Sequence, residues 1–273
     1  MHRLGVCSWS LRPTGPADLV AKIQATGLAH CQLALEPIRS GRWDEAETTA
    51  ALRRAGITVV SGMMEMEGED YATLDSIRAT GGVRPDATWP GNLAKAAPTA
   101  ALAQRLGLRL VSFHAGFLPH AAGAAERDTM LGRLRQLAAA FAPAGVQLAL
   151  ETGQEDAQTL LGVLAELAGT GIGVNFDPAN MILYGMGDPV AALAALAPHV
   201  RQAHVKDALP AARAGTWGSE VPVGTGAVPW PEFLRRIPRG IDLLIEREAG
   251  TERVADVRKA REVVAGLLPE LAR

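Results

Sequence analysis

Four stretches of this 273-residue chain decide its fold: LALETG (residues 148–153), GVNFDPAN (173–180), RQAHVKDA (201–208) and LLIEREAG (243–250). Each runs from apolar residues into an acidic or imidazole side chain, as a buried strand does when it ends in a single polar group. The polar ends are Glu151, Asp177, His204 and Glu246. Buried polar groups cost free energy unless they share a partner, and three clustered carboxylates repel each other without a cation. The pattern therefore predicts one divalent metal site at the mouth of a barrel of parallel strands.

The spacing of these residues fits consecutive units of such a barrel. Asp177 follows Glu151 by 26 positions, His204 follows Asp177 by 27, and Glu246 follows His204 by 42. The first two intervals match one strand–helix unit, and the third is one unit with a longer loop. Neighbouring strand ends in a closed barrel lie about 5 Å apart, so four consecutive ends can surround one ion. Three carboxylate oxygens and one imidazole suit Mn²⁺ first, with Mg²⁺, Co²⁺ or Zn²⁺ as alternatives.

Short apolar runs alternate with longer Ala- and Leu-rich stretches along the whole chain. The predicted strands are Leu4–Ser10, His30–Leu35, Thr58–Met63, Arg109–His114, Val146–Glu151, Ile172–Asp177, Val200–His204 and Leu243–Glu246. The expected helices follow Pro16 and span about Asp44–Ala55, Leu93–Leu106, Arg127–Phe141, Ala157–Ala168, Pro189–Leu196, Pro231–Arg236 and Arg253–Leu271. This α/β alternation predicts a (β/α)8 TIM barrel that forms a single domain over residues 1–273. The alternative is an open doubly wound sheet. The sequence does not favour it, because no GxGxxG motif follows the first predicted strand.

Two predicted connections are longer than the rest: residues 64–91 and residues 208–229. Both follow a strand on the face where barrel active sites form, and long loops there commonly act as lids or substrate walls. Glu65 and Glu67 make the first of these loops rich in charge, which is simplest to interpret as a solvated lid.

The amino-acid composition limits the kinds of partner that the protein is expected to bind. Lys and Arg total 27 against 29 Asp and Glu, a net charge of −2, which gives no electrostatic footprint for nucleic acid or an anionic membrane. No apolar run approaches the ~20 residues of a spanning helix, and the N-terminus lacks the apolar core of a secretory signal. Cys7 and Cys31 lack metal or redox spacing and are expected as buried, reduced thiols. We therefore expect a cytoplasmic protein, and a homo-oligomer is compatible with the sequence.

Several motifs resemble those of the xylose isomerase-like TIM barrel superfamily, which contains sugar (phosphate) isomerases and epimerases with their relatives. The segments that carry the likeness are LALETG, NFDPAN, AHVKD, PVGTGAVPWPEFL and IERE. The likeness spans the chain by architecture, while its specific motifs lie between residues 146 and 250. It implies that Glu151, Asp177, His204 and Glu246 bind one divalent metal ion. It also implies that Glu151 and Glu246 act as acid and base on opposite faces of a sugar.

Three further candidates for substrate binding lie close to the predicted metal ligands in sequence. Asn180 stands three residues after Asp177, where the resemblance implies a substrate-contacting histidine in many epimerases; asparagine can bind a hydroxyl but cannot exchange its proton. Lys206 faces the barrel mouth by strand alternation, either to contact a substrate oxygen or to pair with Asp207 or Glu246. Glu248 shares the face of Glu246 and is expected to orient it or a substrate hydroxyl.

The other candidates end earlier strands. His114 closes the fourth predicted strand, where it can bind substrate, support a ligand or make a structural hydrogen bond. Trp9 ends the first strand and can stack on the apolar face of a sugar or pack in the core. Arg247 is expected in an ion pair of the barrel wall.

These features predict a metal-dependent sugar isomerase or epimerase that removes a proton alpha to a carbonyl through an enediolate. The substrate class is a ketose, keto-sugar or keto-glycoside. A lyase for a keto-inositol or dehydroshikimate-like ring is the first alternative, because it would use the same C–H acidity. An endonuclease IV-like AP endonuclease and a non-catalytic sugar-binding barrel are the others. The sequence shows no convincing phosphate cradle, since GTG at 224–226 is too short to carry one.

Overall fold

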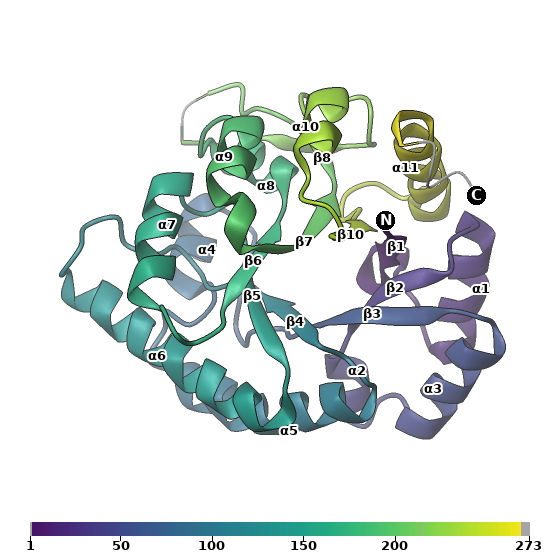
Figure 1. Cartoon of the computed structure of the whole chain (residues 1–273), viewed down its shortest axis with the longest axis horizontal. Coiled ribbons are helices and arrows are strands. Elements are labelled where there is room, and N and C mark those ends of the chain that lie inside the picture. The colour runs from purple at the N-terminus through teal and green to yellow at the C-terminus, as the bar shows by residue number, and fades with distance from the viewer. Residues whose placement is uncertain (1, 214, 269–273) are drawn as a thin grey trace.

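A computed structural model describes residues 2–213 and 215–268 of the chain. Eight parallel strands close into a barrel in the order β1-β10-β7-β6-β5-β4-β3-β2, which confirms the (β/α)8 prediction (Figure 1). The barrel strands are β1 (Leu4–Cys7), β2 (His30–Ala34), β3 (Thr58–Met63), β4 (Leu110–Phe113), β5 (Gln147–Glu151), β6 (Gly173–Phe176), β7 (Val200–Val205) and β10 (Asp242–Ile245). Because β5, β6, β7 and β10 are consecutive in this order, the four predicted ligand residues come from neighbouring strand ends.

Helices surround the barrel and bury their apolar faces against it (Figure 1). They are α1 (Pro16–Thr26), α2 (Glu36–Arg39), α3 (Glu45–Arg54), α4 (Leu74–Thr80), α5 (Trp89–Arg105), α6 (Ala125–Phe141), α7 (Ala157–Glu166), α8 (Pro178–Tyr184), α9 (Pro189–Leu196), α10 (Trp230–Arg236) and α11 (Arg253–Leu267). Phe113, Phe141 and Phe176 are among the largest fully buried side chains. Within the described residues, no helix has the length and apolar character needed to cross a bilayer.

The structure differs from the predicted secondary structure mainly at strand ends and in short helices. β1 ends at Cys7 because the chain turns into a 3-10 helix (Ser8–Leu11), where the Ser8 hydroxyl accepts the backbone N–H of Ala34 at 2.9 Å. The short helices α2, α4 and α8 were not among the predicted elements. The expected end of the last helix at Leu271 lies outside the described residues.

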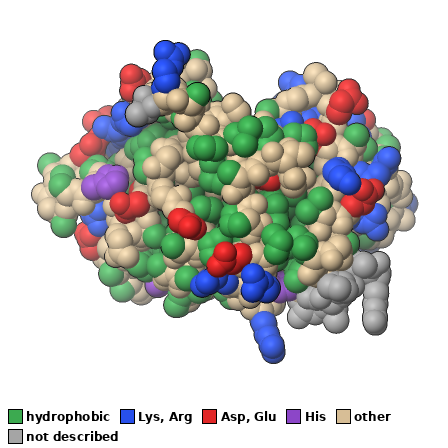
Figure 2. Space-filling model, turned by 90° about the horizontal axis from the view of Figure 1, so that it is seen from above, with side chains coloured by type: hydrophobic (Ala, Val, Ile, Leu, Met, Phe, Trp, Pro, Cys, Tyr) green, Lys and Arg blue, Asp and Glu red, His purple; other side chains and the backbone are tan. Residues whose placement is uncertain are grey.

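The two long connections also contain regular structure. The first includes α4 and the start of α5. The second forms an antiparallel hairpin of β8 (Asp207–Leu209) and β9 (Ser219–Val221) and then a compact turn that leads into α10. On the face shown in Figure 2, acidic and basic side chains are interspersed rather than gathered by sign.

Asp207 organises the turn that precedes α10. Its side chain is 1% exposed and accepts hydrogen bonds from the backbone N–H groups of Gly224, Gly226 and Val228. It also accepts one from Trp230 Nε1 at 2.9 Å. A single buried carboxylate therefore satisfies donors across the PVGTGAVPW segment, which explains why that segment folds without regular structure.

We expect Asp207→Ala to lower the free energy of unfolding by about 3 kcal/mol, because it leaves several buried donors without an acceptor. This corresponds to a fall in melting temperature of about 6–12 °C for a domain of this size. The matched control is Asp188→Ala, which removes a carboxylate that only caps α9 through Val190 and Ala191 and should cost about 1 kcal/mol. Thermal unfolding followed by circular dichroism distinguishes the two, and equal losses would contradict the organising role of Asp207.

Candidate metal centre

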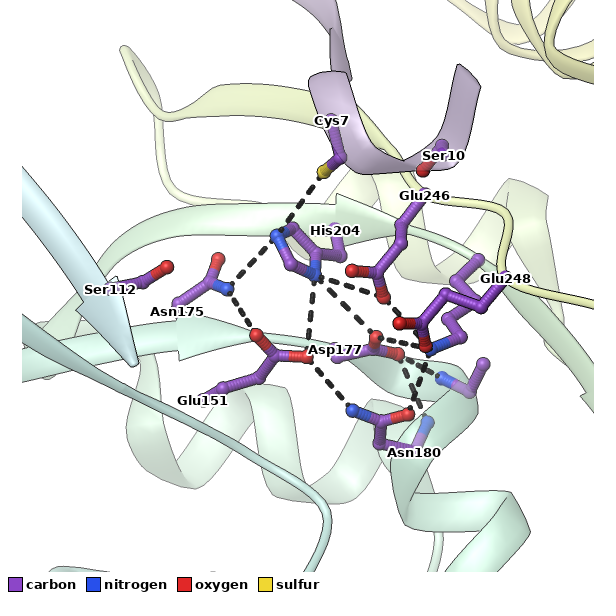
Figure 3. Close-up of polar contacts among 12 residues, drawn as sticks. Cys7, Ser10, Ser112, Glu151, Asn175, Asp177, Asn180, His204, Glu246 and Glu248 are labelled. Atoms are coloured by element: carbon purple, nitrogen blue, oxygen red, sulfur yellow. Dashed lines mark hydrogen bonds and ion pairs between the residues drawn. The ribbon is translucent and has the colours of Figure 1, made fainter. Parts of the chain in front are cut away.

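The four predicted ligand side chains meet at the carboxyl ends of the strands (Figure 3). Each contributes one ligand-type atom, and these atoms all lie within 4.8 Å of one another. His204 Nδ1 lies 3.5 Å from Glu151 Oε1, 3.6 Å from Asp177 Oδ2 and 3.4 Å from Glu246 Oε2. All four side chains are at least nine-tenths buried. The sequence thus identified a real cluster that could hold a metal ion.

Two buried atoms in this cluster lack any hydrogen-bond partner in the described structure: Asp177 Oδ2 and His204 Nδ1. The other oxygen of Asp177 is already used, since Oδ1 caps α8 by accepting from the backbone N–H groups of Ala179 and Asn180. Buried polar atoms are almost always paired. A cation in contact with both Asp177 Oδ2 and His204 Nδ1 would give each atom a partner. The donor set therefore fits a divalent metal ion.

The position of the His204 ring also fits. Its Nε2 lies 2.9 Å from Gln32 Oε1 and 3.0 Å from Asn175 Nδ2, while the Gln32 amide donates to the Gly62 carbonyl and to Ser112 Oγ. These contacts on Nε2 hold the ring so that Nδ1 faces the carboxylates. Gln32 was not among the predicted site residues, although a polar residue inside the apolar run CQLAL is a usable signal.

We expect Gln32→Met to weaken Mn²⁺ binding by about 10–100-fold, because His204 loses the acceptor that sets its orientation. Isothermal titration calorimetry on the folded variant measures this directly. The matched control is Gln136→Met, the same substitution on the exposed surface of α6, where the side chain donates to the Gly132 carbonyl. A similar loss of affinity in both variants would refute a specific role for Gln32.

Neighbouring donors orient the two glutamates. Glu151 Oε1 accepts from Asn180 Nδ2 at 2.9 Å, and its Oε2 accepts from Asn175 Nδ2 at 3.2 Å. The approach of Asn180 requires glycine at position 153, where φ is +138° and a Cβ would lie 2.3 Å from the Asn180 Cβ. Glu246 Oε1 accepts from Trp9 Nε1 at 2.8 Å. Both carboxylates are therefore held in place before any ligand arrives.

Lys206 provides the positive charge of the site. Its Nζ donates to Glu246 Oε2 at 2.8 Å, to Glu248 Oε2 at 2.6 Å and to Asn180 Oδ1 at 3.3 Å. Burial lowers the pKa of Lys206, but Glu246 and Glu248 raise it, and the net direction is well above the ordinary value. Of the two predicted ion-pair partners, Glu246 is confirmed, whereas the Asp207 carboxylate binds the turn before α10 instead.

The charges of the centre favour a bound cation. The carboxylates of Glu151, Asp177, Glu246 and Glu248 outnumber the Lys206 ammonium that lies among them, so negative charge is in excess. Burial raises the pKa of Glu246, whereas Lys206 and His204 lower it to well below its ordinary value. Burial also raises the pKa of Glu151, and His114 and His204 lower it, with a net downward shift. Both glutamates are therefore carboxylates near neutral pH.

A cavity of about 1480 Å³ opens above this centre. Its lining includes Glu246 and all five predicted substrate-binding residues: Trp9, His114, Asn180, Lys206 and Glu248. Each remaining ligand-type residue touches the lining: Asn180 bonds Glu151, Lys206 Nζ lies 3.9 Å from Asp177 Oδ2, and the Trp9 and His204 ring centroids are 6.2 Å apart.

The long loops supply cavity walls that the sequence could not assign to residues. Tyr71 comes from the loop after β3, where its ring packs edge-on against His114 with centroids 6.1 Å apart. Trp217, from the hairpin connection, packs on Tyr184 of α8 at 4.9 Å. In the sequence, the only sign of their role was that both residues belong to unusually long loops at this face of the barrel.

Beyond the cavity, an ion pair joins the hairpin to the end of β10. Arg247 donates to Glu220 Oε1 at 2.6 Å and to Asp256 Oδ2 at 2.8 Å, as predicted for a residue of the barrel wall. Glu220 also accepts the backbone N–H groups of Glu248 and Ala249. The hairpin is thus tied to the segment that carries Glu248 into the cavity.

Comparison with known proteins gives matches in family and in fold. The family model "Xylose isomerase-like TIM barrel" matches residues 17–267. A xylose isomerase domain protein from Planctomyces limnophilus is 32% identical, with a TM-score of 0.86 over 93% of each chain. The probable 3-DHS dehydratase of petrobactin synthesis from Bacillus anthracis is 18% identical (TM-score 0.74; 97% of this chain, 99% of that chain). An L-ribulose 3-epimerase is 17% identical (TM-score 0.75; 100% and 96%). No curated protein matches the chain.

Proposed function

Because the chain belongs to the xylose isomerase-like TIM barrel family, we propose that it is a divalent-metal-dependent sugar isomerase or epimerase. Its substrate would be a ketose, keto-sugar or keto-glycoside, and Mn²⁺ is the proposed ion, with Mg²⁺, Co²⁺ or Zn²⁺ as alternatives. One observation carries this proposal: two buried, ionised glutamates share a cluster with Asp177 and His204, in which two buried polar atoms have no protein partner.

The two glutamates would perform the proton transfers. A bound divalent ion would polarise the substrate carbonyl and make the adjacent C–H acidic. Glu151 or Glu246 would then remove that proton and leave an enediolate. The other glutamate, after it takes a proton from solvent, would deliver that proton to the opposite face of the same carbon, which inverts the centre. Alternatively, the glutamate that removed the proton would return it to the neighbouring carbon, which interconverts aldose and ketose.

The surrounding side chains would bind and position the sugar. Lys206 keeps a permanent ammonium beside Glu246, so it can stabilise negative charge that develops on a substrate oxygen. Asn180 can bind a hydroxyl while it holds Glu151. Trp9 anchors Glu246 through its indole N–H and offers its ring to the cavity, while His114 and Glu248 add further polar contacts from the wall.

The histidine positions argue against an endonuclease IV-like nuclease. That chemistry uses three metal ions and needs more histidines at the barrel mouth. Of the six histidines, all of which lie in the described part, His114 and His204 face the centre. His30 and His199 lie at the amino ends of β2 and β7, on the opposite face.

The most direct test is incorporation of solvent deuterium into a panel of ketoses, keto-sugars and cyclic ketones with Mn²⁺ supplied. We expect mass-shifted substrate or product for at least one panel member, and loss of the shift when Mn²⁺ is removed with a chelator. Product analysis then separates epimerisation and isomerisation from the lyase alternative, which would release water. Sugar binding with no exchange for any member would instead indicate a non-catalytic barrel.

A further inference from the structure

The cavity continues well beyond the metal centre. Its volume of about 1480 Å³ exceeds the ~300–1,000 Å³ typical of pockets that enclose a drug-sized ligand. The four ligand-type residues occupy the half of the barrel mouth formed by β5, β6, β7 and β10. The cavity extends across the other half, over β2 and β3. We call that part the distal lobe and define it by Glu36, Arg42, Trp43, Glu65, Glu67 and Lys95.

Lys95 gives the distal lobe an unused set of donors. The side chain comes from α5 and is only 6% exposed, yet its ammonium makes no hydrogen bond within the described structure. The nearest carboxylate oxygen, Glu67 Oε1, is 3.9 Å away, which is beyond hydrogen-bond distance. A buried ammonium that lines a cavity with free N–H groups is suited to bind ligand oxygens.

The opposing acid, Glu67, has a fixed backbone and a half-exposed side chain. Gly91 on α5 leaves the room that Glu67 occupies, since a Cβ there would lie 2.3 Å from Glu67 Oε2. The Glu67 backbone N–H donates to Asn92 Oδ1 at 2.9 Å. An acceptor therefore lies close to the unused Lys95 donors, which is the combination that a pair of sugar hydroxyls requires.

Trp43 adds an aromatic surface to the same lobe. Its indole is half-buried, packs against the core cluster and lines the cavity, while its backbone N–H is fixed to the Pro37 carbonyl at 2.8 Å. Rigid aromatic rings with one apolar face pack well on the C–H face of a sugar ring. The lobe thus combines a flat apolar platform with polar donors and acceptors.

Charge balance decides between a neutral and an anionic ligand. The lobe contains three acids, Glu36, Glu65 and Glu67, and two cations, Arg42 and Lys95; Glu36 is also paired bidentately with Arg39, which lies outside the cavity lining. A phosphate would meet more carboxylates than cations there. A neutral ligand rich in hydroxyl groups fits this surrounding better.

From these observations we propose that the distal lobe is a second saccharide subsite, so that the substrate is a keto-glycoside of disaccharide size rather than a free monosaccharide. This inference rests on the proposed function, because it assumes that the reacting keto-sugar lies over the metal centre. The distal lobe would hold the glycosyl group on Trp43, with Lys95 and Glu67 bonded to its hydroxyls.

Calorimetric binding of unreactive neutral disaccharides tests the subsite without any turnover. The probes are maltose, cellobiose, sucrose and trehalose, with glucose, methyl glucoside and glucose 6-phosphate as comparisons. We expect at least one disaccharide to bind about tenfold more tightly than glucose, a preference that Trp43→Ala and Lys95→Met abolish and Trp43→Phe retains. Tighter binding of glucose 6-phosphate, or no preference for any disaccharide, would overturn the subsite.

Deuterium exchange separates this inference from the proposed function. With keto-disaccharides, Trp43→Ala should lower kcat/KM about tenfold and leave exchange into the matching keto-monosaccharide unchanged. Exchange that is equally efficient for both substrates and insensitive to Trp43 would sink the subsite and preserve the isomerase proposal. Disaccharide binding that depends on Trp43, without exchange into any substrate, would preserve the subsite and sink the isomerase proposal.

Discussion

Glu151→Gln and Glu246→Gln should each lower the rate of α-proton exchange by about 10²–10⁴-fold, the usual contribution of a positioned acid or base. Glutamine has nearly the same shape as glutamate, but it cannot accept the substrate proton near neutral pH. The pKa values of both carboxyl groups lie below their ordinary range, so each variant removes a group that can take up and then deliver a proton. The measurement is deuterium incorporation by mass spectrometry under single-turnover conditions with Mn²⁺ at saturating concentration.

Both carboxylates accept a donor on each oxygen, so a glutamine amide N–H must face a donor at either position. At Glu246 these donors are Trp9 and Lys206. At Glu151 they are the amides of Asn175 and Asn180. Glu47→Gln on the exposed surface of α3 is the control and should exchange at the wild-type rate. Wild-type exchange in both site variants would eliminate the proposed acid–base roles.

The sequence could predict the barrel and the central cluster because both depend on strand ends. Glu151, Asp177, His204 and Glu246 each stand where an apolar run stops, and parallel strands bring such positions to one edge of the barrel. No knowledge of side-chain packing was needed. Asp177 also carried an unused signal, since an acid followed by proline is a favourable start for a helix, and α8 begins there.

The cavity walls could not be predicted in the same way. Tyr71 and Trp217 belong to long loops, whose course depends on tertiary contacts rather than on a local period. In the sequence, the segment around Trp43 resembles an ordinary turn and the segment around Lys95 an ordinary surface helix. The two side chains line one cavity only because α2 and α5 pack against each other in the fold. Loops at the mouth of a barrel therefore carry substrate information that the alternation of apolar and polar residues does not encode.

Saturating Mn²⁺ should raise the melting temperature by about 5–10 °C. Binding at 100 times the dissociation constant stabilises the folded state by about 2.7 kcal/mol, and each kcal/mol shifts the melting temperature by about 2–4 °C at this chain length. The ion would provide the partner that Asp177 Oδ2 and His204 Nδ1 lack and would relieve the repulsion among the three carboxylates. Differential scanning fluorimetry with metal-free protein, then with added Mn²⁺, measures the shift.

Asp177→Asn should remove this stabilisation and leave the fold intact. Asparagine still caps a helix through its side-chain oxygen, so the bonds from Asp177 to the first turn of α8 can be kept while the free carboxylate oxygen is lost. Asp188→Asn is a close control, because Asp188 also precedes a proline and caps α9, away from the metal centre. Only the first variant should lose the Mn²⁺ shift. An equal Mn²⁺ shift in both variants would mean that the ion binds elsewhere, and the roles assigned to all four ligand-type residues would fall with it.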